Sequence, residues 1–435
     1  MNKLAARYLL LLLALLTPAL WCAPPQEKQL ALDDGTELSL LTFPAQTAET
    51  YATLIWAPSE HGLQQAEIDI ADALARQLAP AGFEIVVPDY FSSHFLPPGA
   101  SALDQVAASS LTALLQALRR RHADDGDYRI YLVAADKAAV SAMQALRQLQ
   151  REAPLRNTAL ILLNPDVTTG SPTPGKPGHY HPIVASTNAP IFIVQAEKSP
   201  WRLTLLKLQQ ALGAGGSDVF VQLLHDVRDR FYFRPDATAA ESEMARRLPA
   251  LVIRAMQLLE PHVGKPRQAA AIAADPGAKK QPAHARERRL RPYDGPQGRT
   301  LALPDLDGNM RSLESWRGKV VLLNFWASWC PPCVHEIPSM VTLKKRLADR
   351  PFEIVAVNLG ETKEEVLAFL RQHPVNFPVL LDRRNEAARA WRVSAYPTTF
   401  IIDRAGNIRF ALAGGRDWAD DATIELLRQL LDEGA

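Results

Sequence analysis

The sequence predicts an α/β protein built from two domains that are joined by a linker. Apolar runs of strand length alternate with helical periods over residues 28–263. The composition then shifts to proline, alanine and basic residues over 264–296, and a second alternation of strands and helices fills residues 297–435. A chain of 435 residues with 47% apolar residues is long enough for two or three domains with full-sized cores.

The first domain is expected to hold a parallel sheet that is wound with helices on both faces. Its strand-like runs are 52–58, 83–91, 129–136, 158–166, 189–197 and 218–225. Its helical periods are 65–82, 103–122, 138–153, 202–213 and 239–260. Strands that are apolar at nearly every position, alternating with helices, are typical of a doubly wound parallel sheet.

The segment 264–296 is predicted to be a linker. Between residues 265 and 291, eight Lys and Arg residues stand against one Asp and one Glu. Such a composition cannot bury enough apolar surface to order itself. The alternative is an electrostatic contact with anionic lipid headgroups or with an acidic partner.

The second domain reads as strand, helix, strand, helix, strand, short helix, hairpin and helix. In order, these elements are 318–328, a helix to about 349, 352–359, 363–373, 377–382, 385–393, the hairpin 398–414 and the helix 419–434. The hairpin turn is expected at Arg404–Asn407.

Charge and cysteine content exclude several functions. The formal net charge is +1, so no nucleic-acid partner is expected. The chain has three cysteines, which are too few for a disulfide scaffold or for a zinc site made of four cysteines.

Residues 1–23 are predicted to be a signal peptide. Two basic residues precede the apolar stretch "YLLLLLALL" (8–16), which is shorter than the roughly 20 residues of a spanning helix. We therefore expect export to the periplasm, where disulfides persist. The alternatives are an uncleaved membrane anchor and lipidation at Cys22, although Trp21 stands where a lipidated cysteine normally follows a small residue.

The stretch "NFWASWCPPCVHEIPSM" (324–340) places two cysteines at a junction from strand to helix. At the start of a helix, free N–H groups and the helix dipole stabilise a thiolate, which is the attacking species in disulfide exchange. Cys330 is therefore the expected nucleophile, and Cys333, one turn later, is expected to resolve the mixed disulfide. A metal site would need further soft ligands, and only His335 is near, so no metal ligands are assigned here.

Three patterns in the second domain match one family in order. They are "VVLLNFWASWCPPCVHEIP", "IVAVNLGETKEEVLAFLRQHPVNFPVLLD" and "VSAYPTTFIIDRAGNI". Residues 297–435 thus resemble the thioredoxin fold and, within it, the exported TlpA/ResA-like thiol-disulfide oxidoreductases. The resemblance covers about 140 residues, which is nearly all of this domain.

This resemblance implies roles for four further residues. Pro397 is expected to be a cis-proline that faces the CxxC and presents the backbone at Tyr396 to a substrate chain. Glu336 matches an acidic residue near the family's active site and is expected to exchange protons with the thiol of Cys333; the alternative is a solvated helix residue. Trp329 is expected to flank the disulfide and limit its exposure, with simple packing as the alternative.

The direction of electron flow is also taken from the family. Neither of the intervening residues, Pro331 and Pro332, carries a charge that would strongly stabilise a thiolate. Family members mostly act as reductants of protein disulfides and are recharged by a membrane thiol reductant of the DsbD kind. A protein-disulfide reductase that needs no bound cofactor is therefore expected, ahead of an oxidase or isomerase. Apocytochrome c, in cytochrome c maturation, and copper-site proteins are substrates at the level of the family only.

The first domain resembles the α/β-hydrolase fold in its pattern. That family places a nucleophile elbow, G-x-S-x-G, after a central strand. Here residues 134–138 read "AADKA", so both glycines are alanines and the serine is Asp136. The usual acid position holds Ser199, with Glu197 two residues earlier, and His225 is near the expected base position without a clean match.

The first domain is therefore expected to be a catalytically degenerate hydrolase fold that binds a partner or a ligand. Two alternatives stay open: a scaffold protein whose first domain carries the main role, and a redox-regulated hydrolase with Asp136 as nucleophile and His225 as base. His61-Gly62 occupies the place of the family's oxyanion loop. His179 and His181 form a weak metal-binding pattern.

Overall fold

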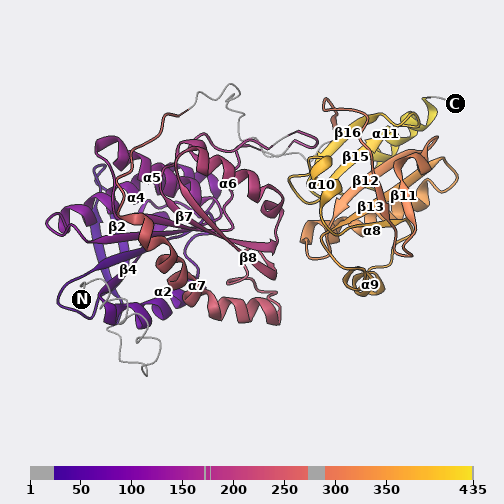
Figure 1. Ribbon diagram of the computed structural model, residues 1–435. Coiled ribbons are helices and arrows are strands. Elements are labelled where there is room, and N and C mark those ends of the chain that lie inside the picture. Colours follow the sequence, from indigo (N-terminus) through magenta and orange to yellow (C-terminus); the bar gives the residue numbers. More distant parts are fainter. Residues whose placement is uncertain (1–23, 171–172, 177, 273–289, 434–435) are drawn as a thin grey trace. The chain divides into compact units, whose positions relative to one another are not determined.

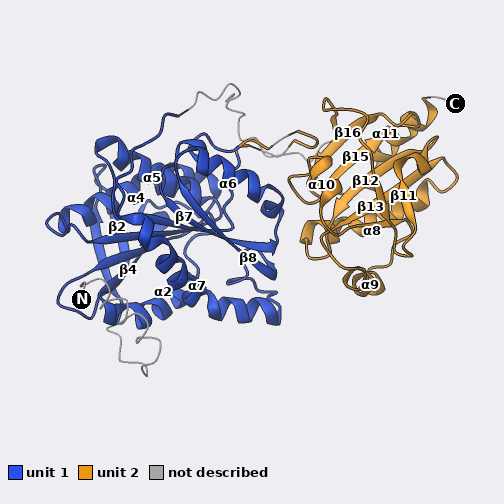
Figure 2. Ribbon diagram, viewed as in Figure 1, with its two compact units in different colours: residues 1–168, 180–277 blue, residues 169–179, 278–435 orange. Residues whose placement is uncertain are grey.

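The computed structural model describes residues 24–170, 173–176, 178–272 and 290–433. The chain divides into two compact units, one with residues 1–168 and 180–277 and the other with residues 169–179 and 278–435 (Figures 1 and 2). The predicted signal peptide 1–23 and Cys22 lie outside the described residues. No helix in the described part of the chain combines the length and apolarity that crossing a bilayer requires.

The first unit is built on an eight-stranded sheet with the order β1-β2-β4-β3-β5-β6-β7-β8. The strands are β1 (Gln26–Ala31), β2 (Glu37–Phe43), β3 (Ala52–Ala57), β4 (Phe83–Asp89), β5 (Arg129–Ala135), β6 (Thr158–Leu163), β7 (Pro190–Lys198) and β8 (Asp218–Arg228). Strands β3 to β8 are parallel, as predicted, and β2 pairs antiparallel with both β1 and β4.

Helices cover both faces of this sheet. They are α2 (Gln65–Leu78), α3 (Tyr90–Ser93), α4 (Ala100–Arg121), α5 (Ala138–Glu152), α6 (Leu205–Ala214) and α7 (Ala239–Val263). Successive strand residues point to opposite faces, so Ile55 joins a core under α4, α5 and α6, while Leu54 and Trp56 join a core under α2 and α7. The strands β3 to β7 are thus buried on both sides, which is why their sequences are largely apolar.

The connections reverse direction between the neighbouring strands β3 and β5. From β3 the chain passes through α2 to β4, on one side, and from β5 it passes through α5 to β6, on the other. The carboxyl ends of β3 and β5 therefore meet at a topological switch point. In open α/β sheets, ligands bind at such a point, in the crevice outside the strand ends.

The second unit is built on a six-stranded sheet with the order β14-β13-β12-β15-β16-β9. Its strands are β9 (Arg291–Pro292), β12 (Val320–Trp326), β13 (Phe352–Leu359), β14 (Val379–Asp382), β15 (Thr398–Ile402) and β16 (Ile408–Ala413), with β10 (Ala302–Pro304) and β11 (Met310–Ser312) as a separate hairpin. Its helices are α8 (Pro331–Arg346), α9 (Lys363–Gln372), α10 (Glu386–Ala390) and α11 (Asp421–Asp432). The predicted order of strands and helices agrees with these elements.

The described ends of the predicted linker belong to the two units. Arg267 is buried, bridges to Leu155 through its backbone, and pairs with Asp218 through its guanidinium. Residues Arg291–Pro292 form β9 and pair with β16. The basic residues at both ends therefore find backbone partners in a folded unit, so the ordered part of the chain is longer than composition indicates.

Candidate functional site

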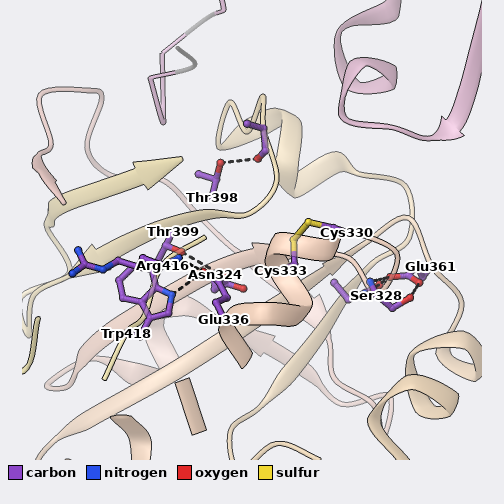
Figure 3. Close-up of a disulfide and its surroundings, with 12 residues drawn as sticks. Asn324, Ser328, Cys330, Cys333, Glu336, Glu361, Thr398, Thr399, Arg416 and Trp418 are labelled. Atoms are coloured by element: carbon purple, nitrogen blue, oxygen red, sulfur yellow. Dashed lines mark hydrogen bonds between the residues drawn. A yellow bond between two sulfur atoms is a disulfide. The ribbon is translucent and has the colours of Figure 1, made fainter. Parts of the chain in front are cut away.

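The two cysteines lie where β12 passes into α8. Cys330 is the N-cap residue of α8, and its carbonyl accepts hydrogen bonds from the N–H groups of Cys333 (3.0 Å) and Val334 (3.1 Å). The two sulfur atoms form a disulfide, with 5.3 Å between the Cα atoms (Figure 3). Cys330 keeps 5% of its surface exposed and Cys333 none. A sulfur atom from outside would therefore meet Cys330 first.

The loop before β15 carries the expected proline. The peptide bond between Tyr396 and Pro397 is cis. The carbonyl of Pro397 accepts a hydrogen bond from the N–H of Gly414 at 2.8 Å. The rings of Trp329 and Tyr396, which flank the two motifs in the sequence, have centroids 5.5 Å apart.

A close backbone approach brings the end of β16 against the first turn of α8. A Cβ atom at Gly415 would lie 2.7 Å from the carbonyl oxygen of Pro332, so only glycine fits there without movement. Because the preceding residue, Gly414, holds the carbonyl of Pro397, this contact ties the proline loop to the CPPC helix. The structure thus brings together five of the predicted residues: Trp329, Cys330, Cys333, Tyr396 and Pro397.

Glu336 is buried on α8, one turn beyond Cys333, with 1% of its surface exposed. Its carboxylate accepts hydrogen bonds from Asn324 Nδ2 (2.8 Å), Trp418 Nε1 (2.9 Å) and the N–H of Arg416 (3.3 Å) (Figure 3). Burial raises the pKa of Glu336 to about 7, although these hydrogen bonds oppose the rise. The alternative of a solvated helix residue is therefore wrong.

Sequence reasoning missed the residues that hold Glu336. Asn324 also donates to Thr399 Oγ1 at 2.9 Å, so it links the carboxyl to β15. A polar residue in a strand that is otherwise apolar is the signal that could have identified Asn324. Trp418 precedes α11 and is distant in the sequence, so no local pattern connects it with Glu336.

A second carboxylate fixes the loop in front of Cys330. Glu361 accepts hydrogen bonds from the N–H of Ser328 (2.7 Å), from the Ser328 hydroxyl and from Asn358 Nδ2 (2.6 Å). These contacts join the end of β13 to the residues between β12 and the CPPC. Because Glu361 and Ser328 are far apart in the sequence, this contact was also not predicted.

In the first unit, Asp136 follows β5 directly and has a φ angle of 47°. The N–H of the next residue, Lys137, donates to the carboxylate of Glu60 at 3.1 Å. In a hydrolase elbow, the N–H of the residue after the nucleophile helps to form the oxyanion hole. Here the N–H of Lys137 already donates to the carboxylate of Glu60, and this negative charge is unfavourable for binding an oxyanion.

The structure does not bring His225 to Asp136. The His225 side chain is 77% exposed, and its ring contacts Glu197 at 3.3 Å. The charged groups that act on Asp136 are instead Glu60, Arg230, Asp229 and Asp166. The expected pair of nucleophile and base is therefore not assembled.

Two of the remaining candidates, Ser199 and His181, take part in local hydrogen bonds. Ser199 caps a short helix (Pro200–Thr204) by accepting the N–H of Trp201 at 3.3 Å. Nδ1 of His181 accepts the N–H of Ile183 at 3.1 Å. Among the described residues, His179 and His181 belong to no group of three or more side chains that could hold a metal ion.

Comparison with known proteins identifies the second unit. The AhpC/TSA family model matches residues 295–411. The thiol-disulfide oxidoreductase ResA of Bacillus subtilis is 40% identical over 121 residues, which cover 28% of this chain and 68% of ResA. ResA of Geobacillus kaustophilus is 40% identical over 114 residues, 26% of this chain and 66% of that protein. A thiol:disulfide interchange protein DsbE from Chlorobium tepidum, known from a crystal structure, shares 33% sequence identity with this chain. The match covers 32% of this chain and 98% of that protein, with a TM-score of 0.28.

These matches agree with the motifs and the geometry of the second unit. The chain spans about two thirds of the length of the curated relatives it matches. The family match lies after residue 294, so it does not extend to the first unit. Through its thioredoxin-fold domain, the chain belongs to the ResA-like family of thiol-disulfide oxidoreductases.

Proposed function

We propose that this chain reduces disulfides of other proteins outside the cytoplasm, through Cys330 and Cys333. The observation that carries this function is the position of Cys330 as N-cap of α8, slightly exposed and bonded to a fully buried Cys333. Free N–H groups at a helix start favour the thiolate form of such a cysteine. The periplasm is the compartment that fits both this chemistry and the predicted signal peptide 1–23.

The reaction transfers two electrons in two sulfur exchanges. The Cys330 thiolate attacks one sulfur of a partner disulfide, forms a mixed disulfide and releases the first partner thiol. The Cys333 thiolate then attacks Cys330, re-forms the bond that the structure contains, and releases the second partner thiol. A membrane thiol reductant, of the DsbD kind by family analogy, would reduce Cys330–Cys333 for the next cycle.

Glu336 is proposed to receive the proton of Cys333. The buried thiol must lose a proton before it can attack, and an acceptor is most effective when its pKa is near the working pH. Burial gives the Glu336 carboxyl a pKa of about 7, and its place one turn after Cys333 supports this role. Pro397, Tyr396 and Trp329 are proposed to receive the substrate chain beside the disulfide.

For the first unit we retain the α/β-hydrolase-like, catalytically degenerate domain, within 28–263, as a proposal. Its doubly wound sheet and the left-handed conformation of Asp136 after the central strand support the fold. The carboxylate of Glu60 on the N–H of Lys137 supports the loss of hydrolase chemistry. A binding role for this domain is therefore favoured over a redox-regulated hydrolase.

Trapping the partner tests the redox function. In the Cys333→Ala variant the mixed disulfide cannot be resolved, so we expect a covalent adduct with partner proteins that dithiothreitol releases. The double variant Cys330→Ser, Cys333→Ala is the matched control and should trap nothing. An absent adduct, or equal adducts in both variants, would contradict the proposed function.

A further inference from the structure

A second group of reactive side chains lies in the first unit, remote in sequence from the cysteines. Glu60 and His61 follow β3, and Asp136 follows β5. One carboxylate oxygen or ring nitrogen from each of these residues lies within 4.8 Å of the others. We call these three residues the Glu60–His61–Asp136 cluster. Among the described residues, no other group of three or more side chains meets this criterion.

The position of the cluster is that of a ligand site in this class of fold. Its members come from the carboxyl ends of β3 and β5, the neighbouring strands between which the connections reverse direction. The loops that follow such strands diverge to opposite sides of the sheet and leave a crevice between them. The sheet therefore places the cluster where ligands bind.

Asp136 provides an independent sign that a ligand is missing. The residue is 5% exposed, and its Oδ2 atom is buried without a hydrogen-bond partner in the described part of the chain. A buried carboxyl oxygen without a partner costs free energy, so it is retained where something else completes its coordination.

The surrounding ion pairs leave the cluster with excess negative charge. Lys137 pairs with Asp166 at 2.7 Å, and Arg230 pairs with Asp229 at 3.2 Å. Within the residues that the structure describes, neither Glu60 nor Asp136 forms an ion pair with Lys or Arg, although the charge of Arg230 acts on both from a longer distance.

We propose that the Glu60–His61–Asp136 cluster binds one divalent first-row transition-metal ion, of which Zn²⁺ is the best match. One imidazole and two carboxylates form a mixed nitrogen and oxygen donor set, which suits Zn²⁺ or Mn²⁺. Mg²⁺ and Ca²⁺ prefer oxygen donors alone and should bind more weakly. The ion would neutralise both carboxylates and give Asp136 Oδ2 a partner.

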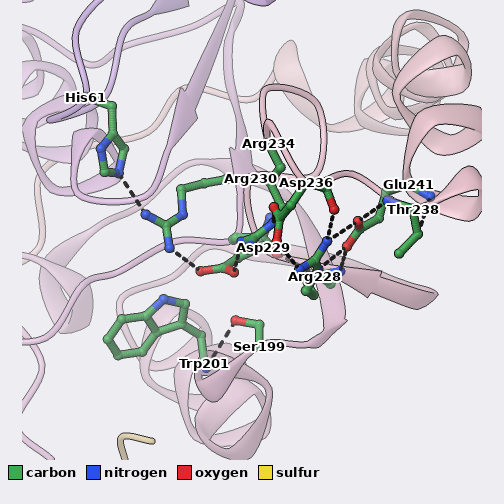
Figure 4. Close-up of polar contacts among 12 residues, drawn as sticks. His61, Ser199, Trp201, Arg228, Asp229, Arg230, Arg234, Asp236, Thr238 and Glu241 are labelled. Atoms are coloured by element: carbon green, nitrogen blue, oxygen red, sulfur yellow. Dashed lines mark hydrogen bonds and ion pairs between the residues drawn. The ribbon is translucent and has the colours of Figure 1, made fainter. Parts of the chain in front are cut away.

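The cationic side chain of Arg230 competes with this ion for the ring nitrogen of His61. Its guanidinium donates to Nε2 of His61 at 3.2 Å and also contacts Asp229 (Figure 4). The neighbouring Arg228 is fixed by Glu241, so the backbone of this loop is held in place. The Arg230 side chain is 36% exposed, and it contacts His61 and Asp229 through different nitrogen atoms.

The test is calorimetric titration of the full chain with ZnCl₂, without a histidine tag and with the disulfide intact. We expect one Zn²⁺ per chain. Each isosteric variant, Glu60→Gln, His61→Gln and Asp136→Asn, should weaken binding by about tenfold or more. His225→Gln, which changes an exposed histidine beside Glu197, is the matched control and should leave binding unchanged.

Two further variants test whether a change in Zn²⁺ binding comes from misfolding and whether the cysteines bind the ion. Arg230→Met removes the competing cation and should tighten Zn²⁺ binding, a gain that damage to the fold would not produce. Cys330→Ser with Cys333→Ser should bind Zn²⁺ as the wild type does. Three results would each overturn the proposed metal site. They are equal affinity for Ca²⁺ and Zn²⁺, equal effects of Asp136→Asn and His225→Gln on Zn²⁺ binding, and loss of Zn²⁺ binding when the cysteines are replaced. None of these results bears on the trapping of a redox partner.

Discussion

Two buried carboxyl groups, Glu336 in the second unit and Asp136 in the first, lie beyond the end of a central strand and near the start of a helix. Glu336 follows β12 and the cysteines on α8, and Asp136 follows β5 just before α5. Glu336 accepts three hydrogen bonds from the protein, whereas Asp136 Oδ2 accepts none from the described residues. The protein itself thus supplies the hydrogen-bond partners of the Glu336 carboxyl, whereas Asp136 Oδ2 needs a partner from a bound ligand.

The same contrast sets the proton affinity of the two groups. Burial raises both pKa values, but for Glu336 the hydrogen bonds from Trp418, Asn324 and Arg416 hold the rise to about 7. For Asp136, burial and the charge of Glu60 raise the pKa, and the charge of Arg230, rather than a hydrogen bond to Oδ2, opposes the rise. Glu336 is thus suited to proton exchange near neutral pH, and Asp136 to a cation.

The largest expected effect is on disulfide turnover, when the redox site and the Glu60–His61–Asp136 cluster are disrupted in separate variants. Cys330→Ser removes the attacking sulfur and should lower the turnover of a peptide disulfide by about a thousandfold or more. Asp136→Asn should leave this turnover unchanged, because its cluster belongs to the other unit. Turnover is followed by thiol release under a constant supply of reductant. Loss of turnover in Asp136→Asn would break the separation of the two sites.

The Glu336→Gln variant tests the carboxyl whose hydrogen-bond partners the protein supplies. Glu336 has a pKa of about 7 in the folded chain against 4.5 as its ordinary value, so the folded state keeps a proton that the unfolded state releases between these values. Glu336 therefore contributes a fall of about 3 kcal/mol in the free energy of unfolding as the pH rises from about 4.5 to about 7, beside the falls from Glu67 and Glu260, whose pKa burial also raises to about 7. The variant has no such proton and should lack this part of the fall, while the falls from Glu67 and Glu260 remain.

Urea unfolding of the oxidised chain at about pH 5 and about pH 8 measures this difference. At the lower pH, Glu336→Gln should be less stable than the wild type, because its amide group faces the N–H donors of Trp418 and Arg416. Asp136→Asn should equal the wild type at the lower pH, since no donor is left unpaired. Equal losses in the two variants would remove the distinction between the carboxyls.

Gly415→Ala tests how tightly the redox site is closed. The added methyl group would meet the carbonyl oxygen of Pro332 at 2.7 Å, so the first turn of α8 or the loop after β16 must move. We expect a loss of about 1–3 kcal/mol in unfolding free energy, measured as above. Gly126→Ala, where an added Cβ meets nothing within 4 Å, is the matched control. A variant as stable as this control would show that the close approach is not required.

The smallest effect is expected from Trp418→Phe, which removes one donor to Glu336. Hydrogen bonds to the charged form lower a carboxyl pKa, so the pKa of Glu336 should rise above 7 by about half a unit to one unit. The pH dependence of unfolding measures the shift. Trp326→Phe is the control of equal volume, because Nε1 of Trp326 is buried and donates to no partner among the described residues. An identical shift in both variants would exclude the hydrogen bond as its cause.

The redox motif was predictable because its determinants are local. A strand that ends in CPPC fixes Cys330 at the helix start, and the family pattern around "AYPTTF" indicated the residues of the proline loop. The partners of Glu336 and Ser328 could not be predicted, because Trp418 and Glu361 reach them only through tertiary folding. Likewise, β1 and β2 were missed, since the edge strand β1 is mostly polar and polar residues interrupt the apolar ones in β2.

In the first unit, the sequence indicated the sheet and Asp136 but not what surrounds it. The apolar strands predicted a parallel sheet because burial on both faces leaves a continuous pattern. The choice of His225 as base followed its place after a strand-like run, yet its side chain points to solvent beside Glu197. Glu60 and His61 reach Asp136 because β3 and β5 are neighbours, a fact of sheet order that no local pattern contains.

The hydrogen bond from Trp418 to Glu336 has a use beyond the tuning of a proton. The indole is fully buried, and its N–H is bonded to a group that gains and loses charge near neutrality. An indole in that position changes its fluorescence with the charge of its neighbour. The difference in emission between the wild type and Trp418→Phe, recorded in a stopped-flow instrument, would therefore time proton movement against sulfur exchange without any added dye.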